Sequence, residues 1–309
     1  MTATLRIATR KSQLAMWQAE HVAALLRAAH PGLHIEMVPL VTQGDRIQDR
    51  SLAAIGGKGL FIKELEVAME EMRADIAVHS MKDVPADLPE GLTIAAVLQR
   101  ADPRDALVTG SGIASLEDLP RGAVLGTSSL RRQAQLLALR PDLRIEAMRG
   151  NVDTRIRKLD AGGMDAIVLA CAGLIRLGLE SRITARLDPT VCLPAVTQGV
   201  IGIECRRSDA DTLAWLRALE DPATRTVMEA ERAFAARLGG SCQSPIAAYA
   251  ELDARGITLR GLVAEPDGSR LLRDTASGDA QRPAALGLEL AERMLTAGAG
   301  PLLERLRAS

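Results

Sequence analysis

Arginines at the starts of predicted helices are the first residues of this 309-residue chain that point to a chemistry. They occur at three helix starts: Arg10, Arg131 with Arg132, and Arg149 with Arg155. A helix N-terminus is partly positive and favours acids, so an arginine placed there costs about 0.3–1 kcal/mol unless it binds something. Backbone N–H groups, hydroxyls and guanidinium groups together make a strong anion site. The repeated pattern therefore predicts a polyanionic ligand.

Arginine is also the strongly preferred base, since only five of the 38 basic residues are lysines. A guanidinium can clasp a planar carboxylate with two parallel hydrogen bonds, which an ammonium cannot do. A biased genome composition would produce the same excess, and the arginines would then be solvated and without function. Position favours function, because each cluster follows the carboxyl end of a predicted strand, where ligands bind in open α/β sheets.

Asp83 and Cys242 stand out by their surroundings. Asp83 lies two residues before Pro85 and suits a turn, but among arginines it would also be ionised and able to steady a developing cation. Cys242 lies in a Gly-Gly-Ser-Cys loop, where a thiol can serve as a nucleophile or an attachment point. The other cysteines lie among aliphatic residues and are expected to fill the core: Cys171, Cys192 and Cys205.

Strands and helices alternate along the first two thirds of the chain. The predicted strands are Leu5–Thr9, Ile35–Val41, Asp75–His79, Ala123–Gly126, Leu143–Ala147, Ala166–Ala170 and Val200–Cys205. This alternation predicts mostly parallel α/β sheets. A break at Arg100–Asp105 separates two blocks of similar size, which suggests two lobes with a cleft between them. The long polar stretch Thr42–Gly59 is a candidate lid.

The last third of the chain changes character. Alternating strands at Ile246–Leu252 and Ile257–Ala264, a Pro-Asp-Gly turn and a third strand predict an antiparallel sheet. Two helices precede this sheet and an Ala/Leu-rich helix closes the chain. A small α+β domain is therefore expected here.

Composition excludes several classes of protein. A net charge of −1 and an aromatic content of 2% argue against a nucleic-acid binder, which needs positive potential or stacking platforms. No uncharged apolar run is long enough to span a bilayer, and the first residues do not resemble a signal sequence. The cysteines and histidines lack metal-ligand spacing, so no metal site is predicted. We expect a cytoplasmic monomer that binds neither nucleic acid nor membrane.

Eight segments, in order over nearly the whole chain, resemble the hydroxymethylbilane synthase (porphobilinogen deaminase) family. They are Arg6-Ile-Ala-Thr-Arg10, Gly56-Gly-Lys-Gly-Leu-Phe61, Ala77-Val-His-Ser-Met-Lys-Asp-Val-Pro85, Asp102-Pro-Arg-Asp105, Gly126-Thr-Ser-Ser-Leu-Arg-Arg-Gln133, Arg149-Gly-Asn151, Leu193-Pro-Ala-Val196 and Ser241-Cys-Gln243. The resemblance implies two lobes like those of type II periplasmic binding proteins, plus the small α+β domain at the C-terminus. It places lobe 1 at 1–98 with 200–216, lobe 2 at 104–193 and the third domain at 220–309.

The resemblance also implies an activity. Transferases of this family deaminate four porphobilinogen units and join them head to tail on a dipyrromethane cofactor, which a thioether would link to Cys242. Hydrolysis then releases hydroxymethylbilane, a linear tetrapyrrole of heme biosynthesis. Every pyrrole ring carries an acetate and a propionate, so the growing product has the polyanionic character that the arginines predict.

Roles for individual residues follow from the same resemblance. Asp83 would hydrogen-bond pyrrole N–H groups and stabilise the cation that forms when ammonia leaves the substrate. The cofactor would be held by Lys82, Thr127, Ser128, Ser129, Arg131, Arg132 and Arg155. The substrate carboxylates would be bound by Arg10, Ser12, Arg149, Gly150, Arg155 and Arg176. Lys58 and Phe61 would belong to the mobile flap.

Three positions depart from the family pattern: Ala54, Thr197 and Ser241. Ala54 replaces a frequent lysine in the flap, Ser241 a frequent glycine, and Thr197 a usual glycine whose loss would stiffen the hinge between lobes. Two other functions remain open. A two-lobed carboxylate-binding sensor would use the same arginines but give Asp83 and Cys242 no task. A thiol hydrolase would use Cys242 as its nucleophile.

Overall fold

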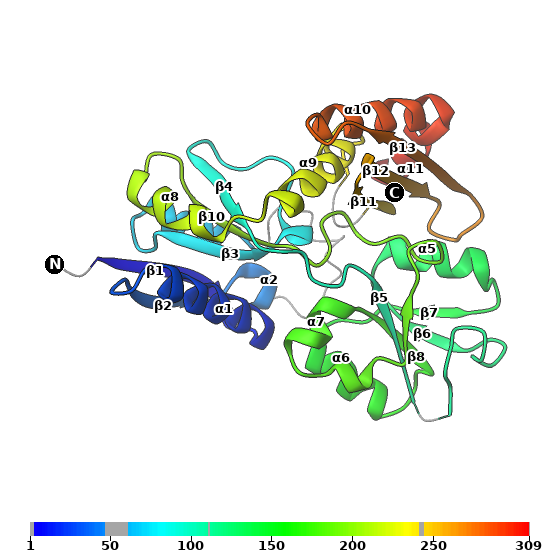
Figure 1. Cartoon of the computed structure of the whole chain (residues 1–309). Helices are drawn as coiled ribbons and strands as arrows, with labels where there is room; N and C mark the ends of the chain where they lie inside the picture. Colours follow the sequence, from blue (N-terminus) through cyan, green and yellow to red (C-terminus); the bar gives the residue numbers. More distant parts are fainter. Residues whose placement is uncertain (1–2, 47–60, 111, 241–243, 309) are drawn as a thin grey trace. The chain divides into compact units, whose positions relative to one another are not determined.

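The computed structural model describes residues 3–46, 61–110, 112–240 and 244–308. The chain forms two compact units, which are Met1–Ala101 with Val200–Arg225 and Asp102–Gly199 with Thr226–Ser309 (Figure 1). The finer division into three domains at the boundaries given above remains a prediction. Within the described residues, every helix is too short or too polar to cross a membrane.

The first unit is built on a five-stranded sheet in the order β2-β1-β3-β10-β4. Its strands are β1 (Thr4–Arg10), β2 (His34–Leu40), β3 (Ile76–Ser80), β4 (Leu92–Val97) and β10 (Ile201–Arg206). All run in one direction except β10, which is antiparallel to both of its neighbours. The strand expected around residues 200–205 is thus inserted between β3 and β4. A strand from late in the chain completes the sheet that holds the first residues.

Helices cover both faces of this sheet. They are α1 (Gln13–Ala29), α2 (Gln43–Arg46), α4 (Lys63–Glu70), α8 (Ala210–Leu216) and two 3-10 turns, Met81–Asp83 and Arg217–Leu219. The Ser12 side chain caps α1 by accepting a hydrogen bond from the Ala15 N–H at 3.3 Å. Helix α1 ends before Pro31, and Gly32 turns the chain with a φ of 97°. A serine before the first turn and a Pro-Gly pair after the last turn are the residue types that favour a helix start and a helix end.

The second unit contains another five-stranded sheet, in the order β7-β6-β8-β5-β9. Its elements are β5 (Asp105–Thr109), β6 (Val124–Gly126), α5 (Leu130–Leu139), β7 (Arg144–Glu146), α6 (Val152–Asp160), β8 (Ala166–Ala170), α7 (Cys171–Arg176), the 3-10 turn Glu180–Arg182 and β9 (Ala185–Leu187). Here β5 is the reversed strand, antiparallel to β8 and β9. Each sheet is therefore mostly parallel with one strand reversed. Sequence periodicity indicated neither β5 nor the short β9.

The C-terminal part of the second unit is an antiparallel sheet with helices packed on it. Its elements are α9 (Pro222–Arg237), which belongs to this unit from Thr226 on, β11 (Ile246–Asp253), β12 (Gly256–Ala264), β13 (Leu271–Gly278), α10 (Pro283–Met294), the turn Leu295–Ala299 and α11 (Gly300–Ala308). This sheet also contacts α5, because Ala134 shares a core cluster with Leu262. Gly268, with a φ of 75°, lies so close to α5 that a Cβ would be 2.6 Å from the Ala138 nitrogen. The expected fold class, two α/β lobes and a small antiparallel domain, is confirmed.

Candidate functional site

The 3-10 turn that carries Lys82 and Asp83 begins directly after β3. Its start is fixed by the Met81 N–H, which donates to the Val200 carbonyl at 3.0 Å. Just before it, the Ser80 hydroxyl accepts a hydrogen bond from the Gln18 amide of α1 at 2.9 Å. Asp83 itself is exposed, and its carboxylate has no hydrogen-bond or ion-pair partner among the described residues. A rigid support thus presents a free carboxylate, which suits an acid that steadies a cation.

Beneath this turn, Glu66 of α4 faces two buried residues of the sheet, His79 and Glu204. Burial and the charge of Glu204 raise the pKa of the Glu66 carboxyl to about 6, from its usual 4.5. The folded protein therefore keeps a proton between pH 4.5 and 6 that the unfolded chain releases. Because the unfolded state binds fewer protons in this window, the free energy of unfolding falls as pH rises through it.

We expect Glu66→Gln to remove this fall, because the glutamine stays neutral at every pH. After allowance for solvent screening at this half-buried site, the variant should be about 1 kcal/mol more stable than the wild type at pH 7. At pH 4 the two proteins should unfold at similar denaturant concentrations. Urea unfolding at both pH values measures the difference. Glu20→Gln on the exposed side of α1 is the control, because Glu20 does not contribute to the Glu66 pKa shift, and an equal gain there would assign the effect to net charge.

Arg10, at the end of β1, is held in the first unit by an acid and an aromatic ring. Its Nε donates to Asp45 Oδ2 at 3.1 Å, and its Nη2 pairs with Asp45 Oδ1. The guanidinium carbon lies 4.2 Å from the centre of the Phe61 ring, within range of a cation–π interaction. Thr42 Oγ1 donates to the same carboxylate at 2.7 Å. Asp45 thus occupies the side of Arg10 that a substrate carboxylate would use.

Of the predicted substrate-binding residue Ser12 and the predicted flap residues Lys58 and Phe61, the structure describes Ser12 and Phe61. The Ser12 hydroxyl caps α1, as described, and lies two residues beyond Arg10. Phe61 rests on Gly44, where a Cβ would be 2.3 Å from the ring. Lys58, Ala54 and most of the expected lid at 42–59 lie outside the described residues, so the lid stays a prediction.

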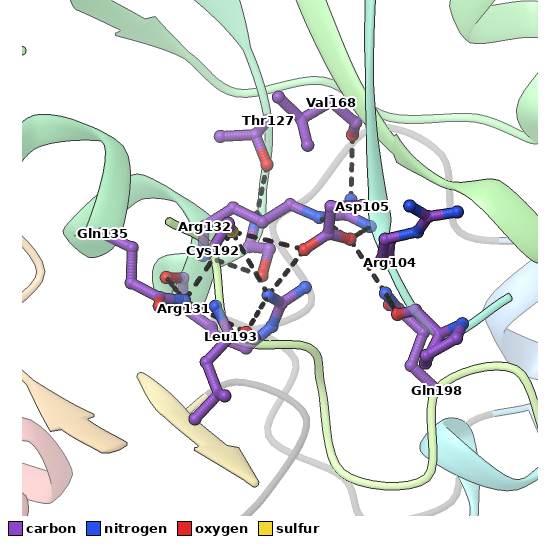
Figure 2. Close-up of polar contacts among 12 residues, drawn as sticks. Arg104, Asp105, Thr127, Arg131, Arg132, Gln135, Val168, Cys192, Leu193 and Gln198 are labelled. Carbon is purple, nitrogen blue, oxygen red and sulfur yellow. Dashed lines mark hydrogen bonds and ion pairs between the residues drawn. The ribbon is translucent and has the colours of Figure 1, made fainter. Parts of the chain in front are cut away.

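In the second unit, Arg131 and Arg132 converge on Asp105 (Figure 2). The Arg131 Nη1 donates to Asp105 Oδ2 at 2.7 Å and to the Leu193 carbonyl at 2.7 Å. Arg132 donates to Asp105 Oδ1 through Nε at 3.0 Å and Nη2 at 2.7 Å. All three side chains are at most 7% exposed. The first turn of α5 therefore holds a buried ion cluster.

This cluster carries an excess positive charge. Burial alone would raise the pKa of the Asp105 carboxyl, but Arg131 and Arg132 outweigh burial and hold that pKa far below its usual range. One carboxylate thus faces two guanidinium groups, which leaves a net charge of about +1 at the N-terminal end of a helix. All the hydrogen bonds of the Arg131 guanidinium to described residues run through Nη1, so Nε and Nη2 keep donors for another acceptor. These features fit an anionic group such as a pyrrole carboxylate.

We expect Asp105→Asn to destabilise the protein by about 3–5 kcal/mol, because two buried guanidinium groups lose their counter-charge. The loss should appear as a lower midpoint of thermal unfolding, together with less bound cofactor by intact mass. Asp160→Asn is the control, since Asp160 pairs with Arg182 at the surface and its loss should leave the midpoint almost unchanged. Equal effects of the two substitutions would contradict the central role of Asp105.

The three hydroxyls between β6 and α5 order the chain around this cluster. Thr127 Oγ1 accepts the Ser129 N–H at 3.2 Å, and Ser129 caps α5 by accepting the Arg132 N–H at 3.4 Å. The Ser128 hydroxyl donates to the Met148 carbonyl at 2.7 Å and accepts the Met148 N–H at 2.9 Å. In this conformation their oxygens are engaged with the backbone, and their predicted contacts to a cofactor remain predictions.

Arg149, Gly150 and Arg155 lie together at the start of α6. The Gly150 carbonyl accepts a hydrogen bond from Arg155 Nε at 2.8 Å. Gly150 has a φ of 110°, and a Cβ there would be 2.8 Å from the Thr154 side chain, so a glycine is required. The Arg149 guanidinium has no hydrogen-bond or ion-pair partner among the described residues. This arrangement supports the sequence-based expectation of an anion site at a helix start.

Arg176 ends α7 and donates to the Gly199 carbonyl at 2.7 Å. Burial lowers the pKa of its guanidinium to about 10. The neighbouring Thr197 has a φ of 58°, a left-handed conformation that is strained for a β-branched residue. The substitution noted in the sequence thus falls where backbone freedom would have been useful.

Three of the four cysteines lie within the described residues, and all three are buried. Cys171, Cys192 and Cys205 are buried thiols, and burial raises their pKa to about 12, 12 and 11. They fill the core, as predicted. Cys242 and Ser241 lie outside the described residues, and the attachment role of Cys242 remains a prediction. His79, which a thiol hydrolase would need as a base, is hydrogen-bonded to Glu204 through Nε2 at 2.8 Å.

Two acids, Asp45 and Asp105, are functional candidates that sequence reasoning missed. Asp105 belongs to the segment Asp102-Pro-Arg-Asp105, which resembles the family. No sequence signal linked this acid to the arginines 26 and 27 residues later. Gln198 also joins this cluster, donating to Asp105 Oδ1 at 3.0 Å and to the Pro103 carbonyl at 2.7 Å. The sequence signal that could have identified Asp105 is a charged residue at the start of a mostly apolar segment, which forms β5.

Three of the solved structures that are similar to this chain are under 20% identical to it. The periplasmic VFT2 domain of Bordetella pertussis BvgS is 16% identical over 70% of this chain and 86% of its own, with a TM-score of 0.41. The methionine-binding protein MetQ is 14% identical over 70% of this chain and 89% of its own, with a TM-score of 0.45. A TRAP periplasmic solute binding protein from Desulfovibrio salexigens is 13% identical over 73% of each chain, with a TM-score of 0.44.

Family models match almost the whole sequence. Residues 5–214 match "Porphobilinogen deaminase, dipyromethane cofactor binding domain", and residues 225–296 match "Porphobilinogen deaminase, C-terminal domain". The first match alone includes the Asp83 turn, the Asp105 cluster and the arginines of α6 and α7. With both models matched in order, the chain belongs to the porphobilinogen deaminase family.

Proposed function

We propose that Asp83 stabilises the cation formed during porphobilinogen deamination, and that arginines of this chain bind the carboxylates of substrate and cofactor. The overall reaction is that of the family, the deamination and polymerisation of porphobilinogen on a dipyrromethane cofactor. The observation that carries the proposal is the buried Asp105–Arg131–Arg132 cluster, whose excess positive charge suits an anionic ligand.

Arg131 and Arg132 would hold the cofactor carboxylates, with Lys82, Arg155 and the hydroxyls of Thr127, Ser128 and Ser129. The support is local, since Arg131 keeps Nε and Nη2 donors and lies at a capped helix start. Charge-assisted hydrogen bonds to a carboxylate are roughly twice as strong as neutral ones. When bound, the cofactor supplies the pyrrole carbon to which the first substrate unit is joined. Asp105 would keep both guanidinium groups oriented during each addition.

Arg10, Ser12, Arg149, Gly150, Arg155 and Arg176 would bind the incoming substrate. For Arg10 this requires an exchange of partners, because Asp45 already occupies its bidentate face. Arg149 offers a guanidinium without a partner among the described residues. A carboxylate bound to such groups is oriented as well as attracted, which brings the reacting carbons together.

Asp83 would act when ammonia leaves the aminomethyl group and positive charge spreads over the pyrrole ring. A carboxylate about 4 Å from a unit charge is worth roughly 4 kcal/mol at an effective dielectric of 20, before desolvation. Such stabilisation lowers the barrier only where charge develops, which raises the rate rather than mere binding. Asp83 is exposed in the turn after β3 and its carboxylate has no partner among the described residues, which supports this role.

Intact-mass measurement under denaturing conditions tests the proposed function directly. The purified protein should be heavier than its sequence by two linked pyrrole units, because a thioether survives unfolding. Brief addition of porphobilinogen should produce further steps, each of one pyrrole unit. A carboxylate-binding sensor would show the bare sequence mass and no steps, which would refute the enzymatic proposal for these residues.

A further inference from the structure

A buried pair of ionisable residues lies beneath the Asp83 turn. Glu204 of β10 is fully buried, and its Oε2 lies 2.8 Å from Nε2 of His79, the fourth residue of β3. In the antiparallel register Glu204 is opposite Ala77, and His79 is opposite Gly202. All four residues therefore face the same side of the sheet, which α4 covers. The pair connects the end of β3, the central strand of this sheet, to its neighbour β10.

This pair of ionisable residues stabilises the core less than apolar side chains would. The second oxygen of Glu204, Oε1, is buried and has no hydrogen-bond partner among the described residues. A buried carboxylate with one partner gains less than it loses by leaving water, and apolar residues of the same size often give a more stable protein. The pair is therefore a poor stability device. Its location indicates what it does instead.

Met81, the first residue of the turn Met81–Asp83, packs against β10. Its sulfur lies over Gly202, where a Cβ would be 2.1 Å away, so a larger residue there would push the methionine side chain aside. Its N–H donates to the Val200 carbonyl of the same segment. His79 and Met81 are two residues apart and thus share a face, one bonded to Glu204 and the other packed on Gly202. Asp83 follows two residues later on this doubly anchored segment.

We propose that His79 and Glu204 are positioning residues for Asp83, holding the end of β3 and the turn after it in the orientation that the reaction needs. The inference rests on the proposed role of Asp83. It also explains why a directional contact between ionisable side chains is used where an apolar one would stabilise more. A buried hydrogen bond between the His79 imidazole and the Glu204 carboxyl fixes the position of the strand end, whereas apolar packing permits small shifts, and a shift of about 1 Å can cost 100-fold in rate.

Glu204→Leu tests this inference, because it keeps the approximate size of the side chain and removes the hydrogen-bond partner of His79. We expect kcat to fall about tenfold, with KM within about twofold of the wild type and the cofactor mass unchanged. Glu204→Gln and His79→Gln should each retain most of kcat, since an amide side chain can replace either partner in the hydrogen bond. Should Glu204→Leu fail to fold, His79→Leu removes the other partner and makes the same test.

Ile203→Val is the matched control. Ile203 is buried on the opposite face of β10, so its truncation lowers the melting temperature without touching the pair. If Glu204→Leu changes only the melting temperature and leaves kcat at the wild-type value, as Ile203→Val should, the pair is merely structural and the inference fails. If Asp83→Ala itself leaves kcat near the wild-type value, the proposed function of Asp83 fails instead. The two failures are therefore distinguishable.

Discussion

A Cys242→Ser variant is expected to carry no covalent cofactor and to lose turnover completely. A thiol near neutral pH provides a reactive thiolate, whereas a serine hydroxyl is a weak nucleophile unless a base activates it. The thioether should therefore not form, although the arginines that bind carboxylates remain in place. Intact mass under denaturing conditions should give the bare sequence mass for the variant and two additional pyrrole units for the wild type.

Cys171→Ser is the matched control for this experiment. Burial raises the pKa of the Cys171 thiol to about 12, so it holds almost no thiolate at neutral pH and cannot replace Cys242 as the attachment point. The control should keep both the cofactor mass and the activity. A Cys242→Ser protein that retains the two pyrrole units would move the attachment elsewhere. Ester hydrolysis that stops when Cys242 is alkylated would favour the thiol hydrolase.

Asp83→Ala is expected to lower kcat by about 10²–10³-fold while leaving most of the cofactor bound. The expected loss is that of one preorganised group aimed at developing charge, which is about 2.7–4 kcal/mol. Binding of the cofactor should persist, because the buried arginine cluster around Asp105 is in the second unit and does not involve Asp83. Steady-state kinetics and intact mass, measured on the same preparation, separate the two effects.

Asp87→Ala provides the control for Asp83→Ala. Asp87 is an exposed acid in the same connection before β4, and it contributes the same charge without lying on the anchored turn. Its removal should change kcat by less than about twofold. A large loss in both variants would indicate a general electrostatic effect of this loop. A near-normal rate for Asp83→Ala would remove Asp83 from the chemistry altogether.

Local sequence signals predicted much of the fold because they act over a few residues. Ser12 and Ser129 have hydroxyls of the kind that cap helices and they cap α1 and α5, and Pro31-Gly32 follows the end of α1. The apolar strand Ala166–Ala170 has the same bounds in the structure as in the prediction. Sheet order was less accessible, since the reversed strands β5 and β10 are joined to their neighbours by contacts far apart in sequence.

The candidate site likewise combines residues that local sequence signals identify with pairings that depend on distant parts of the chain. Spacing and residue type were enough to select the arginines at helix starts, the acid at the end of β3 and the cysteine of the glycine-rich loop. Sequence could not show that Arg131 and Arg132 share Asp105, or that Arg10 is paired with Asp45. Both pairings join side chains that are 26 or more residues apart, and no local pattern records them.

By itself, then, the amino-acid sequence determined most of the elements, the family and the types of residue available for chemistry, because caps, periodicity and motifs are short-range. The tertiary structure alone decided which charges are buried and which partners neutralise them. That outcome depends on the two reversed strands, which bring distant segments into one sheet and put Glu204 beneath His79 and Asp105 beside two arginines. Electrostatic energies rise steeply with burial, so these long-range placements set the properties of the site.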